Sequence, residues 1–177
     1  MNEAILVECP AVVGPYTRDI PRPQCVHCFR LTPSPAPRCP RCHLPVCSSS
    51  CSSPHHAAEC RLLRGAGPGR RVGEEHYAPV MALRLLALRS SAPDTWARFL
   101  RLEHHAERRR EEEPELWAYH QEHVVAVVRR CGVELEEEEV HRLLGRMFTN
   151  CGDLTLGAGY GRGCGYYPTY ANINHSC

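Results

Sequence analysis

The sequence of 177 residues predicts an α+β fold in which a small, irregular cysteine-rich module lies between short strands and a mainly α-helical part. Three observations predict this class. Seven of the twelve cysteines lie between Cys25 and Cys60, in a stretch rich in proline and serine. Apolar residues recur at helical spacing between Pro79 and Asn150, and strand-like segments occur near both ends of the chain.

The first expected element is one strand, or a pair of short strands, between Ile5 and Val13, interrupted at Pro10 and closed by Gly14-Pro15. The cysteine-rich stretch that follows has too few apolar residues, too irregularly spaced, to build a packed core. Something other than apolar burial must therefore stabilise it. After this stretch, the sequence GAGPGRRVG from Gly65 to Gly73 predicts a linker.

Four helices are expected between Pro79 and Asn150. Pro93-Asp94 separates the first from the second, and Gly132 ends the third. Their apolar faces are formed by Val80, Leu83, Leu85, Leu86 and Leu88; by Trp96, Phe99, Leu100 and Leu102; by Leu116, Tyr119, His123, Val124, Val127 and Val128; and by Val140, Leu143, Leu144 and Met147.

The last stretch of the chain is rich in glycine and tyrosine. Leu154 and Leu156 alternate as in a strand. The glycines from Gly157 to Gly165 match neither a dinucleotide-binding loop nor a Walker loop, so they indicate a flexible turn.

The overall composition excludes several classes of protein. The formal net charge is +1, from 21 basic and 20 acidic residues, so neither nucleic acid nor membrane attraction follows from it. No apolar run approaches the roughly 20 residues of a spanning helix, and no basic, apolar secretory signal begins the chain. A reducing compartment, cytoplasmic or nuclear, is therefore expected. There, twelve cysteines indicate metal binding rather than disulfides.

The charges are unevenly distributed. Between Arg18 and Arg71 nine arginines accompany two acidic residues, whereas Glu103 to Glu139 contains twelve glutamates and five arginines. Blocks such as Glu136 to Glu139 are typical of a solvated helix face or a first helical turn. The basic module suits acidic or phosphate-bearing partners. Nucleic-acid binding is not expected, because Phe29 is the one aromatic residue among the module's arginines.

The strongest chemical signal is a series of eight residues of the types that zinc prefers. They are paired as Cys25-x2-Cys28, Cys39-x2-Cys42, Cys47-x3-Cys51 and His56-x3-Cys60. A Cys-x2-Cys turn can direct both sulfurs at one ion, and residues four apart share one face of a helix. Eight ligands make two tetrahedral zinc sites. The neighbouring His27, His43 and His55 are expected to lie outside both sites.

Spacing alone leaves two groupings open. In the sequential one, the first four ligands bind one ion and the last four bind the other. In the interleaved one, Cys25, Cys28, Cys47 and Cys51 bind one ion and Cys39, Cys42, His56 and Cys60 bind the other. The pattern resembles the MYND zinc finger, and this resemblance implies the interleaved grouping. Where that family often has tyrosine and glutamine, this chain has Val46 and Ser52, a difference that concerns the peptide-binding surface rather than the zinc.

A second resemblance lies at the far end of the chain. Tyr166-Tyr167-Pro168 and Asn174-His175-Ser176-Cys177 resemble segments of SET-domain methyltransferases. Together with the finger they resemble the SET-and-MYND (SMYD) family, and PVCSSSC and HHAAEC resemble its arthropod SmydA branch. The resemblance implies that Asn174 and His175 bind S-adenosylmethionine and that Cys177 ligates a third zinc ion with cysteines of a later segment.

The resemblance also implies a domain organisation, with an irregular zinc-stabilised MYND finger inserted in a truncated SET domain that has a mainly α-helical insert. Residues 1–20 would be the N-terminal strands of the split SET domain, and residues 25–60 the finger. Residues 61–78 would be a linker, residues 79–150 the helical insert, and residues 151–177 an incomplete SET core.

For function, we expect a zinc-binding protein-interaction module in a fragment of a SET-domain protein. The complete protein would be an S-adenosylmethionine-dependent protein-lysine methyltransferase that acts on histones or other proteins. Two alternatives are an active methyltransferase and a catalytically silent SET-MYND adaptor. We expect no methyl transfer by this chain, because the family's catalytic tyrosine, its later cysteine cluster and the Gly-x-Gly near the start of its SET domain have no counterpart among these residues. No catalytic residue is assigned, and the expected partners are proline-rich or other peptide segments of proteins.

Overall fold

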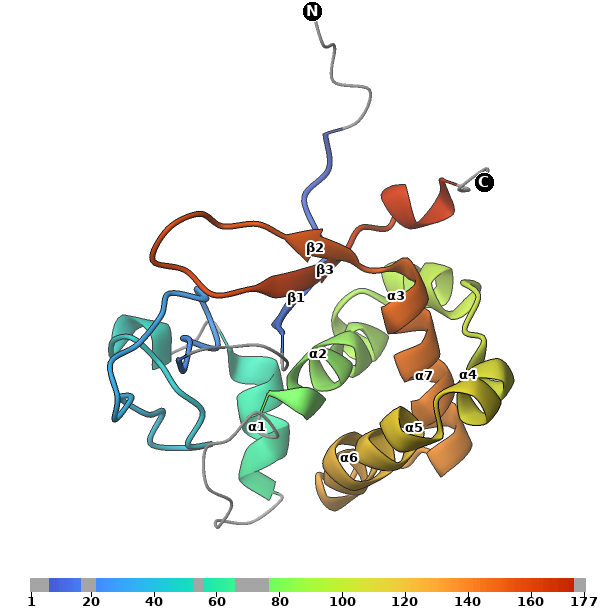
Figure 1. Ribbon diagram of the computed structural model, residues 1–177, viewed down its shortest axis with the longest axis horizontal. Coiled ribbons are helices and arrows are strands. Elements are labelled where there is room, and N and C mark those ends of the chain that lie inside the picture. Colours follow the sequence, from blue (N-terminus) through green and yellow to red (C-terminus); the bar gives the residue numbers. More distant parts are fainter. Residues whose placement is uncertain (1–6, 17–21, 53–55, 66–76, 174–177) are drawn as a thin grey trace, which may run out of the picture.

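The computed structural model describes residues 7–16, 22–52, 56–65 and 77–173. These residues form three parts: a small sheet, a helical body, and the cysteine module, which we define as residues 22–52 and 56–65. Figure 1 shows the sheet beside helix α2, with the cysteine module at one end and the helical body at the other. The fold is of the α+β class, as the sequence predicted.

The sheet joins segments that lie about 150 residues apart. Its strands are β1 (Val12–Pro15), β2 (Gly152–Leu154) and β3 (Gly163–Tyr166), antiparallel in the order β1-β3-β2. Val12 pairs with Tyr166, and Gly152 pairs with Gly165. The first strand was expected between Ile5 and Val13. Strand β1 instead starts at Val12 and ends at Pro15.

Strand β3 corrects the expectation of a flexible turn over the glycines from Gly157 to Gly165. Two of these glycines lie in the central strand of the sheet instead. A Cβ on Gly163 would lie 2.9 Å from the carbonyl oxygen of Gly14, so the glycine allows β1 and β3 to approach closely. The glycine-rich pattern reflected close packing of the backbone as well as turns.

The helical body contains α2 (Ala78–Ser91), α3 (Pro93–Leu100), α4 (Ala106–Glu112), α5 (Pro114–His120), α6 (Ala126–Arg130) and α7 (Glu137–Asn150). A π-helical segment, η3 (Gln121–Val125), joins α5 to α6. Proline occupies the first turn of α2, α3 and α5, where its missing N–H leaves no helical bond unmade. Short α4 was not expected, because its sequence AERRREE has no apolar periodicity. Among the described residues, no helix has both the length and the apolar character needed to cross a lipid bilayer.

The acidic block from Glu136 to Glu139 forms the start of helix α7, as predicted. Glu136 and Glu139 form a capping box, in which each side chain accepts a hydrogen bond from the backbone N–H of the other residue. The next glutamates occupy the first turn, where the helix dipole favours negative charge.

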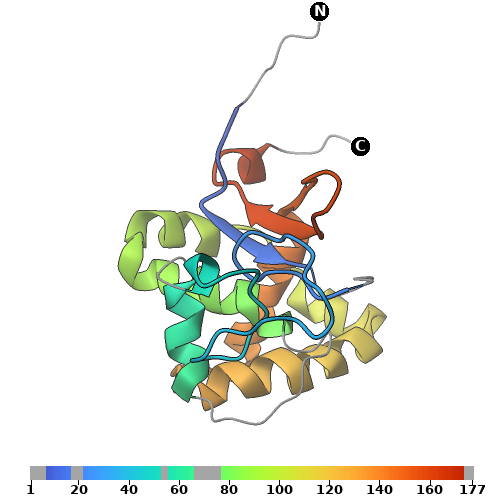
Figure 2. The ribbon, with the colours of Figure 1, turned by 90° about the vertical axis from the view of Figure 1, so that its left-hand side faces the viewer.

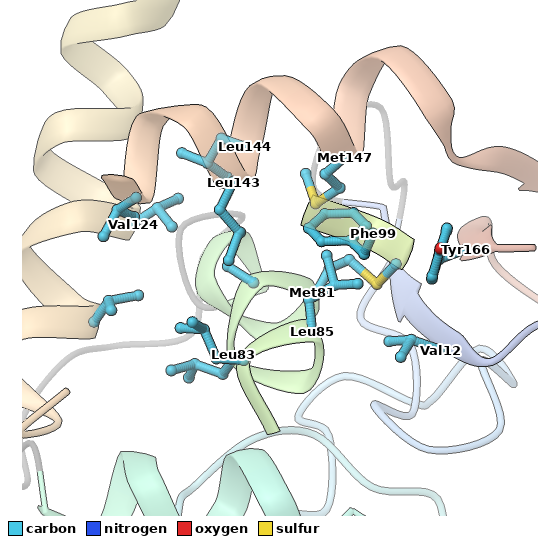
Figure 3. Packing of buried hydrophobic residues seen from close by; sticks show 14 of the residues in the cluster. Val12, Met81, Leu83, Leu85, Phe99, Val124, Leu143, Leu144, Met147 and Tyr166 are labelled. Carbon is cyan, nitrogen blue, oxygen red and sulfur yellow. The ribbon is translucent and has the colours of Figure 1, made fainter. Parts of the chain in front are cut away.

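The main hydrophobic core lies around α2. Leu83 and Leu85 are fully buried between the helices, and Phe99 packs edge-to-face on Tyr166 with ring centroids 5.1 Å apart. Figure 3 shows α7 contributing Leu143, Leu144 and Met147 from the other side of this cluster. Through Val12 and Tyr166 the same core reaches β1 and β3, so the sheet and the helical body share one interior.

The cysteine module has its own small core and two short helices, η1 (Ser50–Ser52) and α1 (Ala57–Gly65). Val26, Leu44 and Val46 are buried there beside Tyr77 and Val80 of the helical body. Figure 2, in which the module faces the viewer, shows its loops packed in front of the sheet and α2. Helix α1 continues to Gly65, into the segment expected as a linker, and residues 66–76 lie outside the described residues.

The connection between β2 and β3 also contacts the cysteine module. The N–H of Leu31 donates to the carbonyl of Gly159 at 3.0 Å, and the N–H of Gly161 donates to the carbonyl of Phe29 at 2.7 Å. These bonds join the module to the last third of the chain by backbone pairing, which no side-chain pattern in the sequence records.

Candidate metal centre

The two Cys-x2-Cys pairs have the same backbone turn. The N–H of Phe29 donates to the carbonyl of Cys25, and the N–H of His43 donates to that of Cys39, both at 2.9 Å. Phe29 and His43, each directly after the second cysteine of its pair, are left-handed, with φ of 61° and 60°. The turn therefore brings both sulfurs of a pair to one side, as metal binding requires.

The first group of side chains consists of Cys25, Cys28, Cys47 and Cys51. Their Sγ atoms all lie within 4.8 Å of one another. The Sγ of Cys47 lies 3.5 Å from that of Cys28 and 3.5 Å from that of Cys51. Cys25 is fully buried, and the other three are partly exposed.

The second group consists of Cys39, Cys42, His56 and Cys60. The Sγ atoms of Cys39 and Cys60 are 3.9 Å apart, and all four ligand atoms lie within 4.8 Å of one another. The N–H of Cys60 donates to the carbonyl of His56 at 3.1 Å, so one helical turn places both side chains on the same face. The second group is more buried than the first, with three of its four members buried.

These distances fit zinc and do not fit disulfides. Zinc–sulfur bonds of about 2.3 Å place the corners of a tetrahedron roughly 3.8 Å apart, close to the observed 3.5 and 3.9 Å. A disulfide bond would be about 2.05 Å long. All eleven cysteines among the described residues have free thiols.

The environment of His56 in the second group also indicates that this residue is a metal ligand. Within the described part of the chain, neither ring nitrogen of His56 has a hydrogen-bond partner with good geometry, although the ring is 2% exposed. Burial lowers the pKa of His56, so the ring is neutral and one nitrogen can donate a lone pair. A buried, unpaired imidazole is unfavourable unless it binds something. Each group could hold one zinc ion.

Zinc binding would require the thiols of the first group to lose their protons. Burial and the hydrogen bond with Cys47 raise the pKa of Cys51 to about 12. Burial opposes ionisation of Cys47 too, but its hydrogen bonds with Cys28 and Cys51 lower its pKa. Since zinc binds thiolates, the ion would displace the protons that these sulfurs otherwise hold.

The structure thus brings together the two sets of the interleaved grouping, and not those of the sequential one. His27 and His43 belong to neither group among the described residues, and His55 lies outside the described residues. The predicted cofactor residues Asn174 and His175 lie outside the described residues too, as does Cys177.

Two residues beside the second group were not identified from the sequence. They are Glu59 and Arg84 of α2, which form an ion pair with each other. The side chain of Glu59 is 1% exposed and that of Arg84 is 12% exposed. Glu59 carried one available signal, because it lies three residues after His56 and is an isolated acid among arginines. Arg84 carried none, because it lies within an apolar helix pattern.

Comparison with known proteins gives one relevant similarity. The chain is similar to a SET domain-containing protein. The match is to SET domain-containing protein SmydA-8, isoform A, of Drosophila melanogaster, with 34% identity over 86 residues. These residues are 48% of this chain and 19% of the relative, so the match spans about a fifth of the relative's length. No family model matches the chain, and no solved structure matches it.

Proposed function

We propose that this chain is a MYND-type zinc-binding module for protein interaction, in a SET-domain protein of the SMYD kind. The observation that carries the proposal is the interleaving of eight ligand side chains into two groups of four, each with its ligand atoms within 4.8 Å of one another. That grouping is the one the resemblance to MYND fingers implies. The similarity to SmydA-8 over 86 residues supports the SET-domain context.

The proposed zinc ions have a structural role. Each group already supplies four protein ligands, so neither leaves the open position that a catalytic zinc needs for water or substrate. The module's own apolar core is small, and the ions would replace the burial that it lacks. Zinc would thus hold a rigid surface for recognition.

The surface of the module suits peptides with acidic character. Exposed arginines are distributed over it, at Arg22, Arg30, Arg38, Arg41, Arg61 and Arg64. Glu59 is the one acidic residue of the described module, and it is buried against Arg84. The resemblance to MYND fingers implies proline-rich protein segments as ligands, which bind in a preformed extended conformation, and the exposed arginines favour acidic residues beside the prolines.

Binding is tested by titrating a proline-rich peptide with flanking acids into the ¹⁵N-labelled, zinc-loaded chain. Shifts confined to amides of the cysteine module, lost when the prolines are replaced by alanine, are expected. A neutral peptide with the same prolines measures the contribution of the arginines. The absence of shifts for all these peptides would contradict the proposed interaction.

Protein-lysine methylation by the whole protein is a second candidate, favoured by the similarity to a SET domain-containing protein. Asn174 and His175 are the residues that the resemblance assigns to S-adenosylmethionine. The test is binding of S-adenosylmethionine to the whole protein by calorimetry. Loss of binding in His175→Ala, with both zinc ions retained, is expected. Unchanged binding would contradict the assignment.

A further inference from the structure

The buried carboxylate of Glu59 has an unusual position between a proposed metal ligand and the helical body. Its Oε1 lies 3.7 Å from Nδ1 of His56 and is ion-paired with Arg84. All three side chains are almost removed from solvent. A carboxylate buried to this degree requires partners, and these two are the ones that the described residues provide.

The position of Glu59 decides how the imidazole faces the sulfurs. With Nδ1 on the side of Glu59, Nε2 is the nitrogen left for the second group of thiols. Histidine ligands commonly donate their other ring N–H to a carboxylate, which fixes the tautomer and raises the basicity of the ligand nitrogen. The backbone of Ser52 is a second neighbour of the ring.

The charge of the site explains why Arg84 is needed as well. Three thiolates and one Zn²⁺ leave one net negative charge, and an adjacent buried carboxylate would add a second. Like charges in a poorly solvated site are unfavourable. The guanidinium of Arg84 neutralises Glu59 and so allows a carboxylate beside an anionic metal centre.

Arg84 also ties the site to the rest of the fold. Its Nη1 donates to the carbonyl of Val13 in β1 at 2.7 Å, and its Nη2 donates to that of Val26 in the cysteine module at 3.0 Å. One guanidinium thus contacts the sheet, the first Cys-x2-Cys turn and the carboxylate beside His56. These contacts converge from three parts of the chain.

We infer that Glu59 and Arg84 are positioning residues for the second metal site. With an ion bound to Nε2 of His56, the Oε1 of Glu59, which lies 3.7 Å from Nδ1, would move a few tenths of an ångström closer and accept Nδ1–H, while Arg84 holds Glu59. This inference rests on the proposed zinc binding. A merely structural ion pair would stabilise the fold without selecting a nitrogen of His56 or one of the two sites.

The test uses the full chain loaded with ¹¹³Cd, and a competitive titration with Co²⁺ that reports the two sites separately. Coupling of ¹¹³Cd to His56 through Nε2 is expected in the unaltered chain. In Glu59→Gln and Glu59→Leu, the affinity of the second group should fall about 10- to 100-fold, more in the leucine variant. The first group, with its four cysteines, serves as the internal control and should keep its affinity.

Coupling through Nδ1, unchanged affinity in both variants, or equal losses at both sites would overturn the inference. If Glu59→Leu fails to fold, Glu59→Gln and the cadmium spectrum of the unaltered chain still decide it. An unaltered chain that binds fewer than two ions would instead overturn the zinc proposal, so the two failures are distinguishable.

Discussion

The hydroxyl group of Tyr77 makes two hydrogen bonds with the backbone of Gln24, donating to its carbonyl at 2.6 Å and accepting from its N–H at 3.2 Å. Both residues are buried, and burial raises the pKa of Tyr77 to about 12. Tyr77 directly precedes α2, and Gln24 directly precedes the first ligand cysteine. This pair therefore connects the first Cys-x2-Cys turn to the helical body.

Replacing Tyr77 with phenylalanine should destabilise the zinc-loaded chain by about 1–3 kcal/mol, because the N–H and carbonyl of Gln24 lose a buried partner. Urea unfolding at fixed zinc measures the change. Tyr170→Phe, at a ring that is 42% exposed, is the control and should be nearly neutral. Equal stability of the two variants would contradict the role of the hydroxyl.

Gly145→Ala should destabilise the chain although alanine is the better helix former. A Cβ at this position would lie 2.0 Å from the carbonyl oxygen of His104, which is backbone and cannot rotate away. Helix propensity favours alanine by about 1 kcal/mol, whereas overpacking typically costs about 1–3 kcal/mol. Thermal unfolding should show a net loss, whereas Thr149→Ala, exposed on the same helix, should show little change. A stabilised Gly145→Ala would mean that α7 does not pack on His104.

Arg84→Met should lower the free energy of unfolding by about 3–5 kcal/mol, since it leaves the charge of Glu59 buried without its partner. Arg89→Met, exposed on the same helix, tests loss of a charge without loss of a buried pair. Chemical denaturation of both variants gives the difference. A similar effect of the two substitutions would show that the buried pair adds nothing.

The ionisation of Glu8 should make the local stability around Thr169 and Tyr170 depend on pH. Its carboxylate accepts the N–H groups of Thr169 and Tyr170 at 2.8 and 2.9 Å, at the start of the short helix η4 (Tyr170–Asn172). Burial slightly opposes ionisation, but these two backbone bonds and the charge of Arg98 lower the pKa of Glu8. Its contribution to stability is therefore present above the unfolded pKa and is lost as the pH falls through the lower, folded pKa.

Glu8→Gln should consequently reduce amide protection of Thr169 and Tyr170 by the same factor at about pH 7 and about pH 5, because the carboxyl stays ionised over this range. Hydrogen exchange followed by NMR measures both amides. A difference that narrows between these two conditions would show that the pKa is not lowered.

The sequence was informative where the structure depends on local spacing. The ligand pairs, the proline starts of α2 and α3, and the acidic start of α7 each depend on residues within about one turn. The sequence does not distinguish the π-helical segment η3 from an ordinary α-helix, because its apolar residues Val124 and Val125 are buried in both cases.

The features that the sequence does not predict depend on contacts between residues far apart in the chain. The grouping of the ligands followed from a family resemblance, since chemistry allowed two groupings. The pairing of β1 with β3, and the ion pair of Glu59 with Arg84, join segments whose sequences carry no mark of each other. The glycines of β3 were ambiguous for the same reason, because close approach and flexibility require the same residue.

The central claim, two interleaved zinc sites, is tested most directly by Co²⁺ absorption of the unaltered chain and of Cys39→Ser, with the number of ions determined by native mass spectrometry. The unaltered chain should bind two ions. Cys39→Ser should damage the site that contains His56 and retain one ion at Cys25, Cys28, Cys47 and Cys51, with a four-sulfur spectrum. A retained site with the spectrum of three sulfurs and one nitrogen, or a single ion in the unaltered chain, would contradict the claim.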